Sequence, residues 1–203
     1  MLSEIEAEIR NCKKCDLWKE KRNYVPGEGN PKAKLFLVGE APGREEDLRG
    51  RPFVGSAGKY LTQLIERKLG LRREDVFITN LLKCRPPRNR DPTEEEIKAC
   101  SPYLIRQLDE VRPEVILCLG RHSARFLFNE MGMNFSKISR ERGKPRRVRK
   151  WGKEVWLLAT YHPAAALYHP ELREEIETDF QVLGNILRER KTLMDFFQFG
   201  FCT

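Results

Sequence analysis

The chain has 203 residues, which is enough for one compact domain with at most a short appendage at each end. Hydrophobic residues make up 40% of the sequence, so the chain can bury a substantial core. Lys and Arg number 38 against 30 Asp and Glu, and the net charge of +8 favours nucleic acid as a partner. The alternative explanation is a strongly solvated surface of the kind found in thermophilic proteins.

The N-terminus and the cysteine content indicate the compartment. Residues 1–9 are acidic and amphipathic, and they lack the basic segment and apolar run of a signal peptide. No segment approaches the roughly 18 consecutive apolar residues of a membrane-spanning helix. We therefore expect a cytoplasmic protein. In that reducing compartment its six cysteines need an explanation other than a disulfide framework.

Short apolar runs and amphipathic stretches alternate along the chain, and they predict buried strands separated by helices. In chain order, we expect strands at residues 34–39, 76–80, 115–120 and 155–160. We expect helices at residues 3–19, interrupted by a cysteine pair, and at 57–69, 93–111, 123–128 and 171–190. Thr93 and Glu96 form a capping box at the start of the third of these helices. The remaining long segments are a Gly- and Pro-rich loop at 40–55 and a basic stretch, either irregular or a β-hairpin, at 136–153.

Strands that alternate with helices predict an α/β protein with a parallel sheet covered on both faces. In such sheets the ligand binds beyond the carboxyl ends of the strands. The four predicted ends are Gly39-Glu40, Asn80, Gly120 and Tyr161-His162. Three of these ends carry polar side chains suited to chemistry, so we expect those three to share one pocket.

Four of the six cysteines have the spacing of a metal site. Cys12 and Cys15 form a C-x2-C pair, and Cys84 and Cys100 lie far away with 15 residues between them. One close pair and two distant single cysteines can supply four thiolates to one centre. The spacing leaves three interpretations open, namely zinc, an iron–sulfur cluster or four unrelated buried thiols. The other two cysteines, in a core strand and in the tail, are not expected to be ligands: Cys118 and Cys202.

Several motifs occur in a fixed order between residues 12 and 165: Cys12-Lys-Lys-Cys15, Gly39-Glu-Ala-Pro-Gly43 with Glu45-Glu-Asp47, Arg51-Pro-Phe-Val-Gly55-Ser-Ala-Gly58, Thr79-Asn-Leu-Leu-Lys-Cys84-Arg-Pro-Pro87, Cys100 and Tyr161-His-Pro-Ala-Ala165. This series resembles the family-4 uracil-DNA glycosylases. The resemblance implies a three-layer α/β/α sandwich with a central four-stranded parallel sheet, and a structural 4Fe-4S cluster on Cys12, Cys15, Cys84 and Cys100. It also implies hydrolysis of the N-glycosidic bond between uracil and deoxyribose in DNA, which leaves an abasic site for base excision repair.

An enzyme of this kind flips the nucleotide into a pocket and reads its Watson–Crick edge. The amide of Asn80 offers an acceptor and a donor in the order that uracil N3–H and O4 require, whereas cytosine presents the opposite pattern. By resemblance, Phe53 stacks on the flipped base, and His162 donates to uracil O2 as negative charge develops there. Without the motifs, Asn80 and His162 would be read as structural, whereas an aromatic ring in a Gly-rich loop, as at Phe53, still favours stacking over core packing. His122 and His169 are given the structural interpretation.

Gly39, Glu40 and Ala41 are expected to line the other side of the pocket. Gly39 lets the backbone approach the base closely. Glu40 is the carboxylate best placed to orient the attacking water or to stabilise the positive charge that develops on the sugar. Ala41 occupies the position where better-known uracil glycosylases place an aspartate, so the general base stays open. Glu46 is expected to flank uracil C5 and exclude the methyl group of thymine.

Two basic clusters suit contacts with DNA phosphates, which make affinity dependent on salt. The residues expected to make these contacts are Lys83, Arg85, Arg142, Lys144, Arg146 and Arg147. The segment after the histidine motif resembles a loop that inserts where the base has left, with Leu167 as the inserted side chain. The expected partner is uracil-containing DNA, single- or double-stranded, and the protein is expected to be a nucleoid-associated monomer.

The predicted domain covers residues 1–190, and a tail follows it at residues 191–203. In the tail, Leu193 stands three residues before the aromatic pair Phe196-Phe197. This spacing resembles the peptide with which repair proteins bind sliding clamps, although Arg190 replaces the usual leading Gln. Exposed aromatic side chains near a terminus indicate an interaction site. The alternative is that these side chains fold back onto the domain.

Two other functions are compatible with a four-cysteine centre. One is a non-catalytic nucleic-acid-binding module that contains an iron–sulfur cluster or zinc. The other is an electron carrier, which needs an exposed cluster that is reduced reversibly. The predicted pocket residues Glu40, Asn80 and His162 disfavour both, because neither function requires a site that binds a base.

Overall fold

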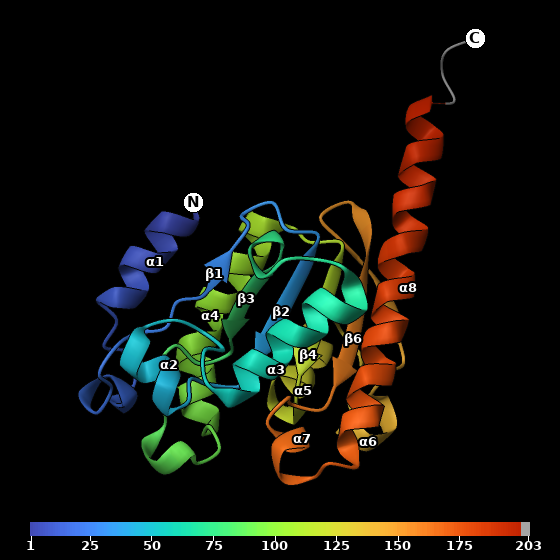
Figure 1. Ribbon diagram of the computed structural model, residues 1–203. Coiled ribbons are helices and arrows are strands. Elements are labelled where there is room, and N and C mark those ends of the chain that lie inside the picture. The colour runs from blue at the N-terminus through green and yellow to red at the C-terminus, as the bar shows by residue number, and fades with distance from the viewer. Residues whose placement is uncertain (200–203) are drawn as a thin grey trace.

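The computed structural model describes residues 1–199, with the side chains of residues 1–189. Within these residues, six strands form one sheet in the order β1-β3-β2-β4-β6-β5 (Figure 1). The strands are β1 (Glu28–Gly29), β2 (Leu35–Gly39), β3 (Phe77–Asn80), β4 (Val115–Leu119), β5 (Arg146–Lys150) and β6 (Lys153–Thr160). The central strands β3, β2, β4 and β6 are parallel, and the two edge strands are antiparallel to their neighbours. The predicted four-stranded parallel sheet is therefore the centre of a wider mixed sheet.

Helices cover both faces of this sheet, as the alternation of elements predicts (Figure 1). The longer helices are α1 (Leu2–Arg10), α3 (Ser56–Leu64), α4 (Glu94–Val111), α5 (Arg121–Glu130) and α8 (Leu172–Phe199). The shorter ones are η1 (Asp16–Lys19), α2 (Arg44–Arg49), η2 (Ile65–Leu69), η3 (Arg73–Asp75), η4 (Pro87–Asn89), α6 (Ile138–Glu141) and α7 (Ala165–Tyr168). The expected three-layer α/β/α sandwich is confirmed.

Alternate residues of the central strands supply the two apolar cores. Leu35 and Leu37 of β2 pack with residues of α3 and α8, whereas Phe36 and Val38 pack with residues of α4 and α5. Successive side chains of a strand point to opposite faces. Because both faces are buried, the strand reads in the sequence as a continuous apolar run rather than an alternating one.

Helix α4 connects the N-terminal segment to the sheet. It begins with the predicted capping box, in which Glu96 N donates to Thr93 Oγ1 at 3.2 Å and Thr93 N donates to the Glu96 carboxylate at 2.9 Å. Farther along α4, Cys100 and Tyr103 join a third apolar cluster with Ile5 and Ile9 of α1, Leu17, Leu82 and Cys84. This cluster holds the N-terminal cysteine pair against the domain.

Several boundaries differ from the predictions. The basic stretch at 136–153 contains α6 and then the β5–β6 hairpin, and α5 extends two residues earlier and two residues later than expected. Helix α8 continues to Phe199, past the predicted domain boundary at residue 190. The side chains of Leu193, Phe196 and Phe197 lie outside the described residues, so the clamp interaction stays a prediction. In residues 1–199, no helix combines the length and the apolar character needed to cross a membrane.

Candidate active site

A pocket opens at the carboxyl ends of the parallel strands, where the strand-end prediction placed it. Its volume is about 300 Å³. The lining includes six residues predicted to contact the base or to surround it: Glu40, Ala41, Glu46, Phe53, Asn80 and His162. The other lining residues are Pro42, Gly43, Ala57, Pro86, Asn89, Arg90 and Ala164. The polar groups of three separate strand ends therefore share one site.

Asn80 ends β3 with a buried side-chain acceptor. Its Oδ1 atom has no hydrogen-bond partner within the described part of the chain. A buried acceptor without a partner costs about 1–3 kcal/mol, and a bound donor would recover that energy. Gly39 lies against the same atom: a Cβ at this position would be 2.3 Å from Asn80 Oδ1 and 2.6 Å from Phe53 Cζ. Only glycine at position 39 leaves both side chains in place.

Phe53 lines the same pocket and has an unusual backbone conformation. Its φ is +48°, in the left-handed region that a residue with a side chain seldom adopts. The ring is 6% exposed and belongs to the apolar core beneath α3, yet it also lines the pocket. Its centroid is 5.5 Å from that of His162, with 27° between the planes. The conformation of the loop thus directs an aromatic face into the site.

Two charged side chains hold this loop. Glu46 accepts hydrogen bonds from the backbone N–H groups of Val54 and Gly55, both through Oε1, at 2.8 and 2.9 Å. Arg73 donates to the carbonyl oxygen of Pro52 at 2.5 Å and to that of Phe53 at 3.2 Å. The Arg73 guanidinium also pairs with Glu28 at 2.9 Å. The sequence pointed to Glu46 but not to Arg73, whose contacts join segments too distant in the chain to form a local pattern.

His162 is presented as a neutral hydrogen-bond donor. The backbone N–H of Ala164 donates to Nδ1 at 3.2 Å, so the neutral ring carries its proton on Nε2. Burial lowers the pKa of His162 to about 4, against an opposing effect of the Glu46 carboxylate. The imidazole is therefore uncharged near pH 7 and has one N–H available. The role of the Ala164 amide was not predicted, because backbone donors leave no signal in residue types.

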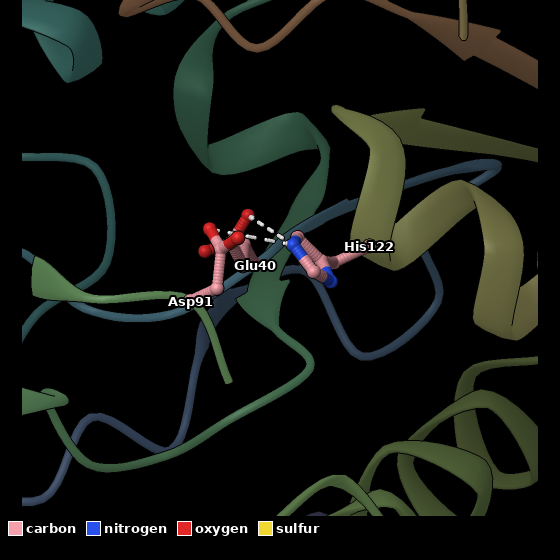
Figure 2. A group of neighbouring side chains, drawn as sticks. All are labelled: Glu40, Asp91 and His122. Carbon is pink, nitrogen blue, oxygen red and sulfur yellow. Dashed lines mark ion pairs between the residues drawn. The ribbon is translucent and has the colours of Figure 1, made fainter. Parts of the chain in front are cut away.

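Glu40, directly after β2, forms a small cluster with Asp91 from a loop and His122 from the first turn of α5. Figure 2 shows its carboxylate and that of Asp91 facing the ring of His122. His122 Nε2 is 3.9 Å from Glu40 Oε2 and 3.5 Å from Asp91 Oδ1. Burial raises the pKa of Glu40, His122 opposes this shift and Asp91 reinforces it. His122 follows the Gly120 strand end, and its ring lies beside Glu40 of the pocket lining.

The four predicted metal-binding cysteines line a second cavity, together with Ile9, Leu17, Trp18, Tyr24, Lys83 and Tyr103. Cys84 and Cys100 are buried, and Cys12 and Cys15 are half-buried. Four thiols around one cavity are a donor set that an iron–sulfur cluster accepts.

Lys83 is not on the surface. It is 1% exposed, and its Nζ donates to Thr79 Oγ1, the carbonyl oxygen of Asn80 and Gln107 Oε1 at 2.6, 2.7 and 2.8 Å. The prediction that Lys83 contacts a phosphate is therefore wrong. Each of its three donors has an acceptor, which offsets the cost of burying the group. Burial lowers the pKa of Lys83 to about 7.

The other basic residues fall into two groups. Arg142 is largely buried and pairs with Glu175 at 2.9 Å and Asp179 at 2.7 Å, which removes it from the set that could contact phosphates. Arg85 donates to Asn89 Oδ1 at 2.7 Å, beside the pocket. The remaining predicted contacts are exposed on or just before edge strand β5: Lys144, Arg146 and Arg147.

Sequence comparisons show the family to which this fold belongs. The profile of the uracil DNA glycosylase superfamily matches residues 26–183. The chain is thus a protein of that superfamily, and the matched residues include the strands whose ends form the pocket. The chain is 57% identical to a type-4 uracil-DNA glycosylase of Archaeoglobus fulgidus over 196 residues, which cover 96% of this chain and 98% of that protein. It is 53% identical to a type-4 uracil-DNA glycosylase of Saccharolobus solfataricus, and the match covers 97% of this chain and 91% of that protein. It is 40% identical to a type-4 uracil-DNA glycosylase of Thermotoga maritima, and the match covers 93% of this chain and 96% of that protein. The chain belongs to the type-4 uracil-DNA glycosylases.

Proposed function

We propose that this protein hydrolyses the N-glycosidic bond between uracil and deoxyribose in DNA and leaves an abasic site without cutting the backbone. The observation that supports this most directly is the buried Asn80 Oδ1 without a partner, in a pocket shared with an aromatic ring and a neutral imidazole donor. A uracil base would satisfy all three groups. The product is the substrate of the later steps of base excision repair.

Asn80 supplies the discrimination between bases. Its Oδ1 accepts from uracil N3–H, and its Nδ2 donates to O4. Cytosine carries an acceptor and a donor in the reverse order, so it would leave the buried amide unpaired at a cost of about 1–3 kcal/mol for each group. Phe53 stacks on the flipped base, which contributes about 1–3 kcal/mol and replaces part of the stacking lost from the duplex.

His162 stabilises the leaving group. As the bond between C1′ and N1 breaks, negative charge develops on uracil O2, and the Nε2–H of the neutral ring donates to that oxygen. The hydrogen bond from Ala164 N to Nδ1 keeps the proton on Nε2 and fixes the ring orientation. A neutral donor suffices, because the interaction strengthens as charge builds on the oxygen.

Glu40 orients the attacking water or stabilises the positive charge on the sugar. Glu40 lines the pocket, and it is the acidic residue between Gly39 and Ala41. Glu46 also lines the pocket, and we propose that it flanks C5 and excludes the thymine methyl group. Because its Oε1 is committed to the loop at residues 54–55, its position there is well determined.

Cys12, Cys15, Cys84 and Cys100 would hold a 4Fe-4S cluster. When bound, the cluster supplies architecture and takes no part in the hydrolysis. The cavity lies between the N-terminal segment, the loop after β3 and helix α4, which also share one small apolar cluster. Four bonds to one centre would fix these three segments relative to each other.

The proposed substrate is uracil-containing DNA, bound as a monomer inside the cell. Arg85, Lys144, Arg146 and Arg147 remain proposed phosphate contacts. Leu167 is 46% exposed on the short helix α7, which begins directly after Ala164 of the pocket lining, and this exposure suits insertion into the gap left by the flipped base. We also propose that Leu193, Phe196 and Phe197 bind a sliding clamp, and a chain that lacks residues 190–203 should lose that binding but keep its activity.

The activity is tested by incubating the protein with a uracil-containing oligonucleotide and then treating it with alkali, which breaks the strand at abasic sites. We expect cleavage only after alkali, and none with cytosine or thymine in place of uracil. Asn80→Ala and His162→Ala should each lower kcat/KM by roughly a hundredfold or more while the fold is retained. Absence of cleavage on U:G, U:A and single-stranded substrates would rule out the enzyme, and normal activity of both variants would refute the assigned roles.

A further inference from the structure

Lys83 connects the cysteine site to the uracil pocket. Its backbone N–H donates to Cys100 Sγ at 3.3 Å, and Cys84 is the next residue in the chain. Its side chain reaches the other way, and Nζ donates to the carbonyl oxygen of Asn80 at 2.7 Å. A single residue thus contacts a thiol of one site and the base-reading asparagine of the other.

The side chain of Lys83 is held by a buried polar network. Its Nζ also donates to Thr79 Oγ1 and Gln107 Oε1, and both of those residues donate in turn to the carbonyl oxygen of Pro26 at 2.8 Å. Lys83, Thr79 and Gln107 are each at most 3% exposed. Hydrogen bonds in such a dry environment are strong and allow little movement. The carbonyl group of Asn80 is therefore held by a side chain that is itself fixed on several sides.

The peptide that follows Asn80 is fixed as well. Leu81 N donates to the carbonyl oxygen of Gly39 at 2.9 Å, and Leu82 N donates to that of Glu40 at 2.9 Å. The end of β3 is thereby tied to the end of β2 on one side and to Lys83 on the other. A displacement of the Lys83 backbone, which contacts Cys100, would be transmitted through Nζ to Asn80.

We propose that Lys83 is a positioning residue that couples the four-cysteine site to Asn80, so that the two sites influence one another. This inference rests on the proposed function. It predicts that the Lys83 side chain contributes to uracil affinity although it cannot touch the base. By thermodynamic reciprocity, uracil binding should also alter the environment of the cysteine site.

The test uses Lys83→Met in the purified, cluster-containing protein. Methionine has a similar length and retains the backbone N–H that contacts Cys100, but it leaves the carbonyl oxygen of Asn80 without its donor. We expect the affinity for free uracil to fall roughly tenfold, because misplacing the amide weakens both of its hydrogen bonds. Iron content and visible absorption should stay at the wild-type values. Saturating uracil should change the visible circular dichroism of the wild-type cluster and leave that of the variant unchanged.

Val111→Ala is the matched control. Val111 is a buried core residue at the end of α4, the helix that also carries Cys100 and Gln107. Its truncation destabilises the same helix without touching the Lys83 network, so uracil affinity and the circular dichroism response should match those of the wild type. If Lys83→Met cannot be obtained with its iron, Gln107→Leu replaces it, since it removes one acceptor of Nζ and contacts no cysteine. We expect about a threefold loss of affinity for that variant.

Three results would overturn the coupling. The first is a uracil affinity within twofold of the wild type in Lys83→Met or in its substitute Gln107→Leu. The second is a loss of uracil affinity in Val111→Ala equal to that in Lys83→Met. The third is a visible circular dichroism spectrum of the wild-type cluster that uracil does not change. Each would leave the proposed function intact as long as the wild-type protein releases uracil from DNA. Failure of that release in the wild-type protein would instead remove the function itself.

Discussion

The imidazole of His162 illustrates how one backbone contact sets the chemistry of a side chain. Ala164 N–H occupies Nδ1, and the surrounding protein makes the cationic form unfavourable. A histidine in this state can donate to a developing anion at any pH where the fold survives. Keeping this ring neutral lowers the stability of the folded protein at low pH, because there the unfolded chain binds a proton and the folded protein does not.

This depressed pKa predicts a specific pH dependence of stability. The pKa of His162 is about 4 in the folded protein against an ordinary value of 6.5, so the unfolded state binds more protons between these values. The contribution of His162 is fully present above pH 6.5 and decreases as the pH falls towards 4. With allowance for solvent at the pocket mouth, the loss is about 2 kcal/mol. Denaturant unfolding of the wild type and of His162→Gln, at pH 7.5 and at pH 4.5, measures it.

The comparison of these two proteins isolates the histidine, because both contain the same other titrating groups and the same cysteine site. We expect the glutamine variant to lose less stability than the wild type on acidification. Parallel losses in the two proteins would show that the His162 ring accepts a proton freely in the folded state.

The burial of Lys83 is a feature that the sequence could not predict. A lysine beside Arg85 in a basic segment is normally exposed, and composition supports that interpretation. Its burial follows from Thr79, Gln107 and the carbonyl oxygen of Asn80, which approach it from separate segments. No local pattern could reveal that arrangement. Asn80 and His162 could be predicted, because strand ends of a parallel sheet converge whatever the details of packing.

Among the elements, the central strands and most helices were predictable because their apolar runs and periodicities are strong. Strand β1 has two residues, and β5 is a basic edge strand, so neither has the apolar signature of a buried strand. The loop around Phe53 was recognised by its motif, but its conformation was not. That conformation is held by Arg73, which reaches the loop from η3 and pairs with Glu28 of β1.

The Arg73 contacts predict that this arginine positions the stacking ring. Arg73→Lys retains the charge but loses the planar fork that holds two carbonyl oxygens and Glu28 at once. Phe53 should then leave its left-handed conformation part of the time, and KM for a uracil-containing oligonucleotide should rise about fivefold to tenfold with kcat changed less. Steady-state kinetics measure the split between the two constants.

Arg72→Lys provides the neighbouring control, since Arg72 is exposed and bonds only to Asp75 in its own turn and pairs with Glu74. Its kinetics should match the wild type. If Arg73→Lys lowers kcat and leaves KM unchanged, Arg73 acts on the chemical step and not on the placement of Phe53.

Across the whole molecule, the net charge of +8 does not by itself locate the DNA. Many cations are paired within the protein, as Arg142 is with Glu175 and Asp179. Strand β5 is antiparallel to β6, and Arg149 lies opposite Glu154 in the register of the two strands. The exposed basic residues of β5 therefore extend away from the pocket. Glu154 is six residues before Thr160 at the pocket end, which places Arg149 about 20 Å along the strand.

Position relative to the pocket should therefore decide which cations bind phosphate. Arg88 is exposed on η4, next to Asn89 of the pocket lining, whereas Arg149 is exposed far along β5. For a duplex that contains an abasic site, the slope of log Kd against log salt should decrease by about 0.9 in Arg88→Ala, the value of one lost phosphate contact. Arg149→Ala should keep the wild-type slope, and both are measured by fluorescence anisotropy over a series of salt concentrations. An equal decrease in Arg149→Ala would instead place the DNA along the β5 edge, and the contacts proposed for Arg146 and Arg147 would then extend along the full length of that strand.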